Sequence, residues 1–124
     1  MYGYYSFVPY NEAASERNIK VRLVQPSIPQ VLKWDRETRE QNFIEYIALS
    51  GRDSLKIPDL IVWGETASPF VLDRDEYHRE MLKPLLSKGS YLVTGMVSYK
   101  EENERFVPYN SLVVFDKQAV PNKL

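Results

Sequence analysis

One carboxylate stands where an α/β sheet would place a catalytic group. Residues 61–70 read IVWGETASPF, so an apolar run ends in Trp63 and Gly64 and is followed directly by Glu65. Ligands of open α/β sheets gather at the carboxyl ends of the strands, where Glu65 falls. A glutamate beside a tryptophan is partly desolvated, and desolvation raises the pKa of a carboxyl group toward the range of a general base. The same spacing fits a neighbour of a helix N-cap, a salt-bridge partner or a solvated loop residue.

Other reactive groups are scarce. The 124 residues contain no cysteine, which excludes disulfides, thiolate metal sites and a cysteine nucleophile within this chain. His78 is the only histidine, so a cluster of several histidines around a metal is excluded. Its polar surroundings predict a surface position. Residues 93–97, VTGMV, lack the glycine spacing of a phosphate-binding loop. We therefore expect no metal site and no cofactor.

Composition indicates one globular domain. Hydrophobic residues make up 44% and charged residues 27%, and the net charge of −1 with scattered basic residues argues against binding to nucleic acid. No apolar run approaches the roughly 18–20 residues that span a bilayer, and the N-terminus lacks the pattern of a signal peptide. By itself the chain is expected to be soluble and cytoplasmic. Residues 1–18 are predicted to be a linker or arm whose aromatic side chains pack on something outside the chain.

The first half of the chain predicts a strand, a helix and a strand. A strand within residues 19–30 ends at Pro26. Its alternating positions are Val21, Leu23 and Gln25 on one side and Lys20, Arg22 and Val24 on the other. A helix within residues 33–53 begins at an Asp35 N-cap and ends at Gly51. Its apolar stripe comprises Phe43, Ile44 and Ile47. Residues 58–65 form a second strand, whose consecutive apolar residues are typical of a covered sheet.

The second half predicts a helix and a hairpin. The helix lies within residues 73–89 and is kinked or broken at Pro84, because proline lacks the backbone donor. Its apolar side comprises Tyr77, Met81, Leu82 and Leu85. Residues 90–99 and 109–116 are strands, and residues 100–105, KEENER, are predicted to be a solvated turn.

The predicted order, β-α-β-α-β-β, indicates the α/β class with a mostly parallel sheet and a terminal hairpin. Besides Glu65, the carboxyl ends of the strands carry Gln25 and residues 94–96. No closing helix follows the last strand, so one face of the sheet is expected to lack cover.

Four segments together resemble one enzyme family. Residues 21–35 (VRLVQPSIPQVLKWD), 58–70 (PDLIVWGETASPF), 91–99 (YLVTGMVSY) and 109–116 (YNSLVVFD) occur in the order found in apolipoprotein N-acyltransferases, membrane enzymes with a nitrilase-like (carbon–nitrogen hydrolase) domain. The stretch from Gln25 to Asp35 is the part that separates this family from soluble nitrilases. The pattern Trp-x-Glu-[Ser/Thr]-Ala marks the catalytic glutamate of the superfamily.

The resemblance implies a function for Glu65 as the general base of a Glu–Lys–Cys triad. In such enzymes the cysteine takes a fatty acyl group from a phospholipid as a thioester, while the lysine helps to hold the oxyanion. The acyl group then passes to the N-terminal diacylglyceryl-cysteine of a lipoprotein. The resemblance implies no cofactor or metal, and a location at the cell inner membrane.

Several features of the family are missing from this sequence. The family's lysine and cysteine lie beyond the segment that matches residues 112–115, and neither Lys117 nor Lys123 sits in the lysine motif. The membrane helices that precede the domain are also missing. The family usually has proline where Gly64 stands.

The sequence is therefore identified as a fragment of such an enzyme. Residues 1–18 would be the arm that follows a membrane domain, and residues 19–124 the N-terminal half of a nitrilase-like α-β-β-α sandwich. The chain alone is expected to be inactive. Two alternatives stay open: a split enzyme, in which a complementing polypeptide supplies the lysine and cysteine, and a non-catalytic interaction module that uses the uncovered sheet face.

Overall fold

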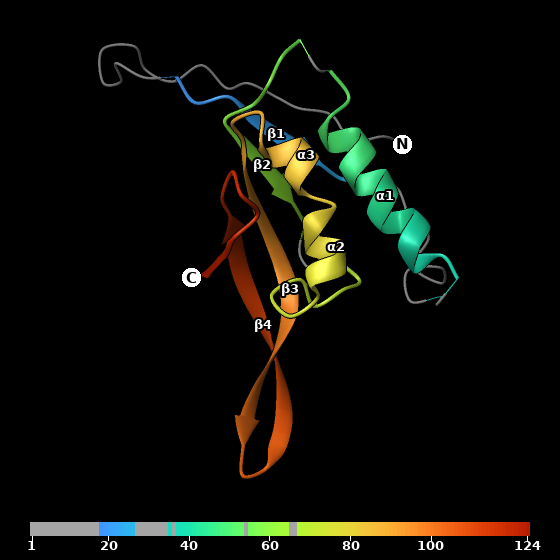
Figure 1. Cartoon of the computed structure of the whole chain (residues 1–124), viewed down its shortest axis with the longest axis vertical. Helices are drawn as coiled ribbons and strands as arrows, with labels where there is room; N and C mark the ends of the chain where they lie inside the picture. Colours follow the sequence, from blue (N-terminus) through green and yellow to red (C-terminus); the bar gives the residue numbers. More distant parts are fainter. Residues whose placement is uncertain (1–17, 27–34, 36, 54, 65–66) are drawn as a thin grey trace.

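A five-stranded sheet organises the part of the chain that the computed structural model describes, which is residues 18–26, 35, 37–53, 55–64 and 67–124 (Figure 1). Its strands lie side by side in chain order: β1 (Val21–Val24), β2 (Leu60–Trp63), β3 (Tyr91–Glu102), β4 (Arg105–Phe115) and β5 (Pro121–Lys123). The first three are mutually parallel, and β3, β4 and β5 are antiparallel. The predicted α/β class and the predicted hairpin are confirmed.

The helices are α1 (Arg39–Ser50), α2 (Glu76–Glu80) and α3 (Lys83–Leu86). The observed order thus differs from the predicted β-α-β-α-β-β in two places, because the second helix is divided and β5 is added. The predicted break occurs where expected, with Pro84 in the first turn of α3, a position that needs no backbone donor. Strand β5 is only three residues long, too short to give a periodic signal.

Helix α1 begins later than its sequence predicts. Its N-cap is Thr38, and Asp35 instead closes the preceding turn by accepting from the amide of Glu37 (2.9 Å). The prediction of Gly51 as the C-cap is confirmed. The buried stripe runs through Phe43, Tyr46 and Leu49, spaced three residues apart, whereas Ile44 is 50% exposed. The predicted stripe was wrong at Ile44, one residue away from the buried face.

Helix α3 and its N-cap residue contribute leucines to the core. Leu82, Leu85 and Leu86 are buried, while Tyr77 is 73% exposed, so its predicted place on the apolar side was wrong. Gly89 ends the unit with φ 119°, a backbone conformation that glycine adopts without strain.

The β3–β4 hairpin is longer than predicted and projects from the domain as a twisted arm (Figure 1). Residues 100–105 were predicted to be a solvated turn, but most of them belong to the paired strands. Only Asn103 and Glu104 form the turn, with φ of 48° and 63°. A two-residue turn with both φ positive follows the right-handed twist of the flanking strands.

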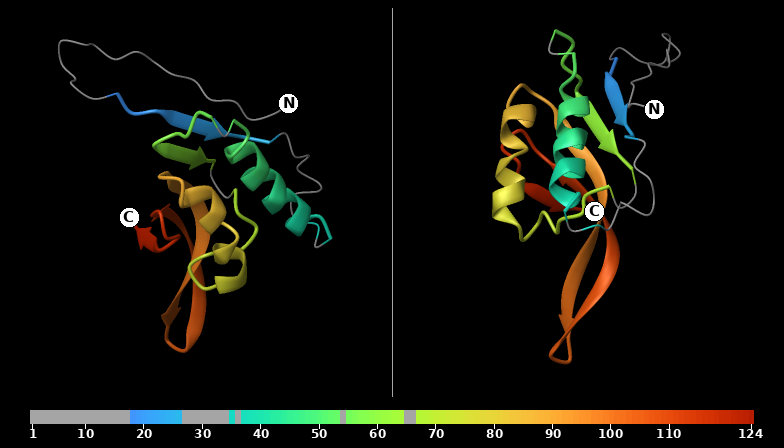
Figure 2. Two further views of the ribbon diagram at one scale, coloured as in Figure 1. Left: turned by 45° about the horizontal axis from the view of Figure 1, so that its top comes forward. Right: turned by 90° about the vertical axis from the view of Figure 1, so that its right-hand side faces the viewer.

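The core lies between the three helices and one face of the sheet, which Figure 2 shows from two further directions. Alternate residues of β1, β2, β3 and β4 contribute to this face, among them Val24, Ile61, Trp63, Leu92, Met96, Val113 and Phe115. In β1 the buried residues are Arg22 and Val24, so the opposite alternation, Val21 and Leu23, faces away from the helices.

The opposite face of the sheet is apolar and uncovered among the described residues. Register places Leu23, Val62, Val93 and Val114 in one row across four strands. Leu23 is 46% exposed, and Leu112 in the next row is 45% exposed. The expected lack of cover on one sheet face is thus present in the described part of the chain.

Candidate functional site

The structure fixes both flanks of the predicted base. Strand β2 ends at Trp63, and the amide of Ala67 donates to the carbonyl of Gly64 (3.3 Å), so this bond spans positions 65 and 66. Glu65 itself lies outside the described residues, as does Thr66. Glu65 therefore remains a prediction, and the structure describes only its sequence neighbours, which are Trp63 and Gly64 before it and residues 67–70 after it.

Trp63 is fixed by helix α1. Its indole is 2% exposed and donates from Nε1 to Ser50 Oγ (2.8 Å), and that hydroxyl donates to the carbonyl of Tyr46 (2.6 Å). The rings of Tyr46 and Phe43 lie 4.9 and 6.0 Å from the indole between centroids. Burial, and secondarily the carboxylate of Glu45, raises the pKa of Tyr46. Trp63, two positions before Glu65 in the sequence, is thus held by a hydrogen bond to Ser50 and by contacts with two aromatic rings.

Sequence reasoning missed Ser50. The available signal was that a buried tryptophan needs an acceptor for its N–H. A serine in the last turn of a helix that packs on the same sheet can supply one.

The other flank of Glu65 is held by a histidine. Ser68 Oγ accepts from the amide of Phe70 (3.1 Å), and the ring of Phe70 stacks on the ring of His78 with centroids 3.5 Å apart. His78 is 8% exposed and bonds to Asp75 and to Glu40 of α1. Its predicted surface position was wrong, because its partners come from a turn and from a helix far away in sequence.

Gln25 and residues 94–96 were also predicted to lie at the carboxyl ends of strands, and the structure describes both. Gln25 follows the end of β1 and is exposed. Residues 94–96 do not end a strand, because β3 continues along β4 to Glu102. Parallel pairing of β3 with β2 nevertheless stops at Val93, so the buried Thr94 lies at the level where β2 ends. Thr94 therefore belongs to the same edge as Trp63.

The lysines near the end of the chain have partners of their own. Lys123 lies 2.6 Å from Asp73 Oδ2 and donates to the hydroxyl of Tyr109 (3.3 Å). These two bonds, that to Asp73 first, raise the pKa of Lys123. Lys117 lies over the ring of Tyr91 at 5.9 Å.

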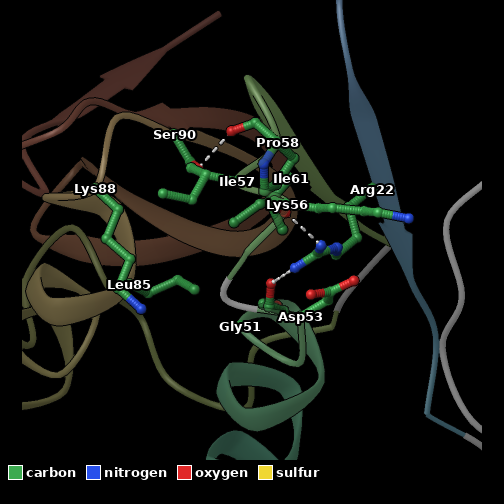
Figure 3. Close-up of a pocket in the computed structure, with 11 residues that line it drawn as sticks. Arg22, Gly51, Asp53, Lys56, Ile57, Pro58, Ile61, Leu85, Lys88 and Ser90 are labelled. Carbon is green, nitrogen blue, oxygen red and sulfur yellow. Dashed lines mark hydrogen bonds between the residues drawn. The ribbon is translucent and has the colours of Figure 1, made fainter.

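A small hollow lies at the opposite end of the sheet, where the strands begin (Figure 3). Arg22, 6% exposed, donates there to the carbonyls of Ser50 (2.5 Å) and Lys56 (2.8 Å), and Ser90 Oγ donates to the carbonyl of Pro58 (2.6 Å). The bond between Arg22 and Ser50 holds the C-terminal end of α1 against β1. Ser50 thus links both ends, its carbonyl to Arg22 and its hydroxyl to Trp63.

Two kinds of feature are missing from the described ranges. Their acidic and histidine side chains include no group of three placed to hold a metal ion. Among these same residues, no helix has the length and apolar character needed to span a membrane.

The sequence is similar to curated bacterial enzymes along most of its length. It is 41% identical over 101 residues to the apolipoprotein N-acyltransferase of Rickettsia typhi, which covers 81% of this chain and 20% of that protein. It is 35% identical over 124 residues to the enzyme of Aquifex aeolicus, covering 99% of this chain and 27% of that protein. The chain is a relative of the apolipoprotein N-acyltransferases.

Further matches agree. The apolipoprotein N-acyltransferase of Rhizobium meliloti is 32% identical over 123 residues, 95% of this chain and 23% of that protein. No family model matches the chain. The chain thus spans about a fifth to a quarter of the length of the curated apolipoprotein N-acyltransferases that it matches.

Proposed function

We propose that this chain is the part of an apolipoprotein N-acyltransferase that supplies the general base, Glu65, from the N-terminal half of a nitrilase-like domain. The observation that carries the proposal is the identity of 32–41% to proteins of that name over 81–99% of the chain. The buried anchor of Trp63, two residues before Glu65, supports the position of the base.

The proposed reaction has two steps. Glu65 takes the proton of a cysteine thiol, and the sulfur attacks the ester carbonyl of a phospholipid, while a lysine stabilises the oxyanion. The lysophospholipid alcohol leaves with a proton, and a thioester remains. The amino group of a lipoprotein's N-terminal diacylglyceryl-cysteine then attacks the thioester, which forms an amide and returns the thiol. The 124 residues contain no cysteine, so the nucleophile comes from outside this sequence and the chain alone forms no thioester.

The frame around β2 suits this role. Trp63, Phe43 and Phe70 exclude water from one side of the strand end, and a carboxyl group beside them binds a proton more readily than one in water. The proposed partners are a phospholipid acyl donor, a lipoprotein acceptor and a polypeptide carrying the lysine and cysteine. The proposed place of action is the cell inner membrane.

A chimera tests the proposal. This chain replaces the matching segment of the Rickettsia typhi relative, and the purified chimera is assayed for transfer of a labelled acyl group from phospholipid to a diacylated lipopeptide. We expect transfer by the chimera and a loss of at least about 100-fold in Glu65→Gln, the usual scale for removal of a general base. The matched control is Glu101→Gln, which removes an exposed carboxylate on the projecting hairpin. A folded chimera that transfers acyl groups equally well with Glu65→Gln would refute the assignment.

A second function is favoured by the uncovered sheet face. Leu23 and Leu112, each nearly half exposed, belong to an apolar surface of the kind that binds another protein surface. As a non-catalytic interaction module, the chain would lose its binding when Leu112 is changed to Ser and would be indifferent to Glu65→Gln. Co-purification with a polypeptide that carries the lysine and cysteine would instead indicate a split enzyme.

A further inference from the structure

A buried histidine joins helix α1 to the turn before α2. His78 Nδ1 lies 2.6 Å from Asp75 Oδ2, and Nε2 is bonded to Glu40 Oε1 in the first turn of α1. Asp75 is also the N-cap of α2, since its Oδ1 accepts from the amide of His78 (3.0 Å). Each ring nitrogen therefore faces a carboxylate from a different element.

The number of protons on the ring follows from these bonds. A neutral imidazole has one donor and one acceptor, whereas an ionised carboxylate can only accept. With both carboxylates ionised, both bonds form without conflict only when both ring nitrogens carry a proton. The charged groups that face the ring are Glu40 from α1 and Asp75 from the turn. Arg79, on the same helix, directs its guanidinium to the carbonyls of Leu72 and Asp73 (3.1 Å each).

Aromatic rings enclose the remaining surface of the imidazole. Phe70 stacks on one face at an interplanar angle of 10°. Phe43 and Tyr77 make edge contacts, with ring centroids 5.6 and 5.0 Å from that of the imidazole. A cation over an aromatic face is attracted by the ring quadrupole. A protonated His78 would therefore be attracted to the ring of Phe70, which follows Glu65 in the sequence.

We propose that His78 is held as an imidazolium between Glu40 and Asp75, and that this cation clamps residues 67–70 to helix α1. His78 is thereby a positioning residue for the loop that carries Glu65. The ionic clamp stands on the contacts alone, and only its consequence for Glu65 rests on the proposed function.

The single histidine makes a direct test possible. In a ¹⁵N spectrum of the imidazole at about pH 7, near where a free histidine titrates, we expect both ring nitrogens of the purified chain to show the protonated signature. In Glu40→Gln the amide can donate to an unprotonated Nε2, so the ring should shift to the singly protonated form. Glu37→Gln, an exposed carboxylate three residues earlier, should leave the ring doubly protonated. A singly protonated ring in the unsubstituted chain at about pH 7 would overturn the proposal.

Hydrogen exchange at the Phe70 amide, which is bonded to Ser68, reports the clamp itself. After correction for the intrinsic pH dependence, exchange should speed up about tenfold when pH rises enough to remove one ring proton, and Glu40→Gln should abolish that response. An equal response in both proteins would refute the clamp.

The link to Glu65 has its own readout in the chimera. Glu40→Gln should lower kcat of the acyl transfer with little change in KM. A loss of the clamp with full kcat would refute the link to Glu65, while an inactive chimera with an intact clamp would refute the proposed function alone.

Discussion

The hydroxyl of Ser50 provides the sharpest test of how β2 is anchored. Its replacement by alanine removes the acceptor of Trp63 Nε1, and the indole, 2% exposed, has no access to bulk water that could replace it. An unsatisfied buried donor costs about 1–3 kcal/mol. Alanine regains roughly 0.5 kcal/mol of helix propensity. We therefore expect Ser50→Ala to lower the free energy of unfolding by about 0.5–2.5 kcal/mol.

Denaturant unfolding of the purified chain measures this change. Ser87→Ala is the matched control, because its exposed hydroxyl makes only a long bond of 3.4 Å to the carbonyl of Pro84, and it should change stability by less than about 0.5 kcal/mol. Trp63→Phe completes a double-mutant cycle, in which the loss from both substitutions should be smaller than the sum of the two. A cost of Ser50→Ala equal to that of Ser87→Ala, with additive behaviour in the cycle, would refute the anchoring role.

Two further predictions concern Gly64 and Lys123. A Cβ added at Gly64 would meet nothing within 4 Å, so Gly64→Ala should raise the free energy of unfolding by about 0.4–1 kcal/mol. If denaturant titration instead showed a lower free energy of unfolding, the backbone at this position would need glycine. Lys123→Met removes the ion-pair partner of Asp73 Oδ2. The Asp73 side chain is 9% exposed and its other oxygen, Oδ1, has no hydrogen bond, so the substitution should cost about 1–3 kcal/mol near neutral pH. Because the pKa of Lys123 is raised in the fold, the ion pair's contribution is complete below about pH 10.4 and declines as pH rises through the folded value. The two proteins should thus approach equal stability in strong alkali, and a constant difference would contradict the ion pair.

Local signals in the sequence predicted the break at Pro84 and the helix ends at Gly51 and Gly89, whereas the start of α1 and the length of the hairpin differ from the prediction. Pro84 acts through its missing backbone donor and Gly89 through its φ of 119°, so their effects do not depend on the rest of the fold. The apolar run of β2 was equally clear. The α/β class followed from the order of such elements, as did the sheet face that the described residues leave uncovered.

Features that depend on tertiary contacts could not be predicted. Ile44 and Tyr77 are apolar enough for a core, but the direction from which the sheet approaches each helix decides which residues are buried. His78 looked like a surface residue because its nearest sequence neighbours are polar. Its burial results from Phe70 and Glu40, and nothing in the local sequence indicates that these two meet it. Glu65 stays a prediction, with only its flanks described.

The sequential order of the strands has a consequence for how the chain assembles during synthesis. Because β1, β2, β3, β4 and β5 lie side by side in the order in which they leave the ribosome, no strand has to insert between two that have already paired. Each new strand adds to the edge left by the previous one, and α1 and then α2 with α3 are available before the next strand arrives. The hairpin of β3 and β4 closes through a turn of two residues, so its pairing requires little loop-closure entropy. The sheet can therefore grow in one direction. A nascent chain that has reached β3 already contains the three parallel strands, and β4 and β5 then add in turn to the edge formed by β3.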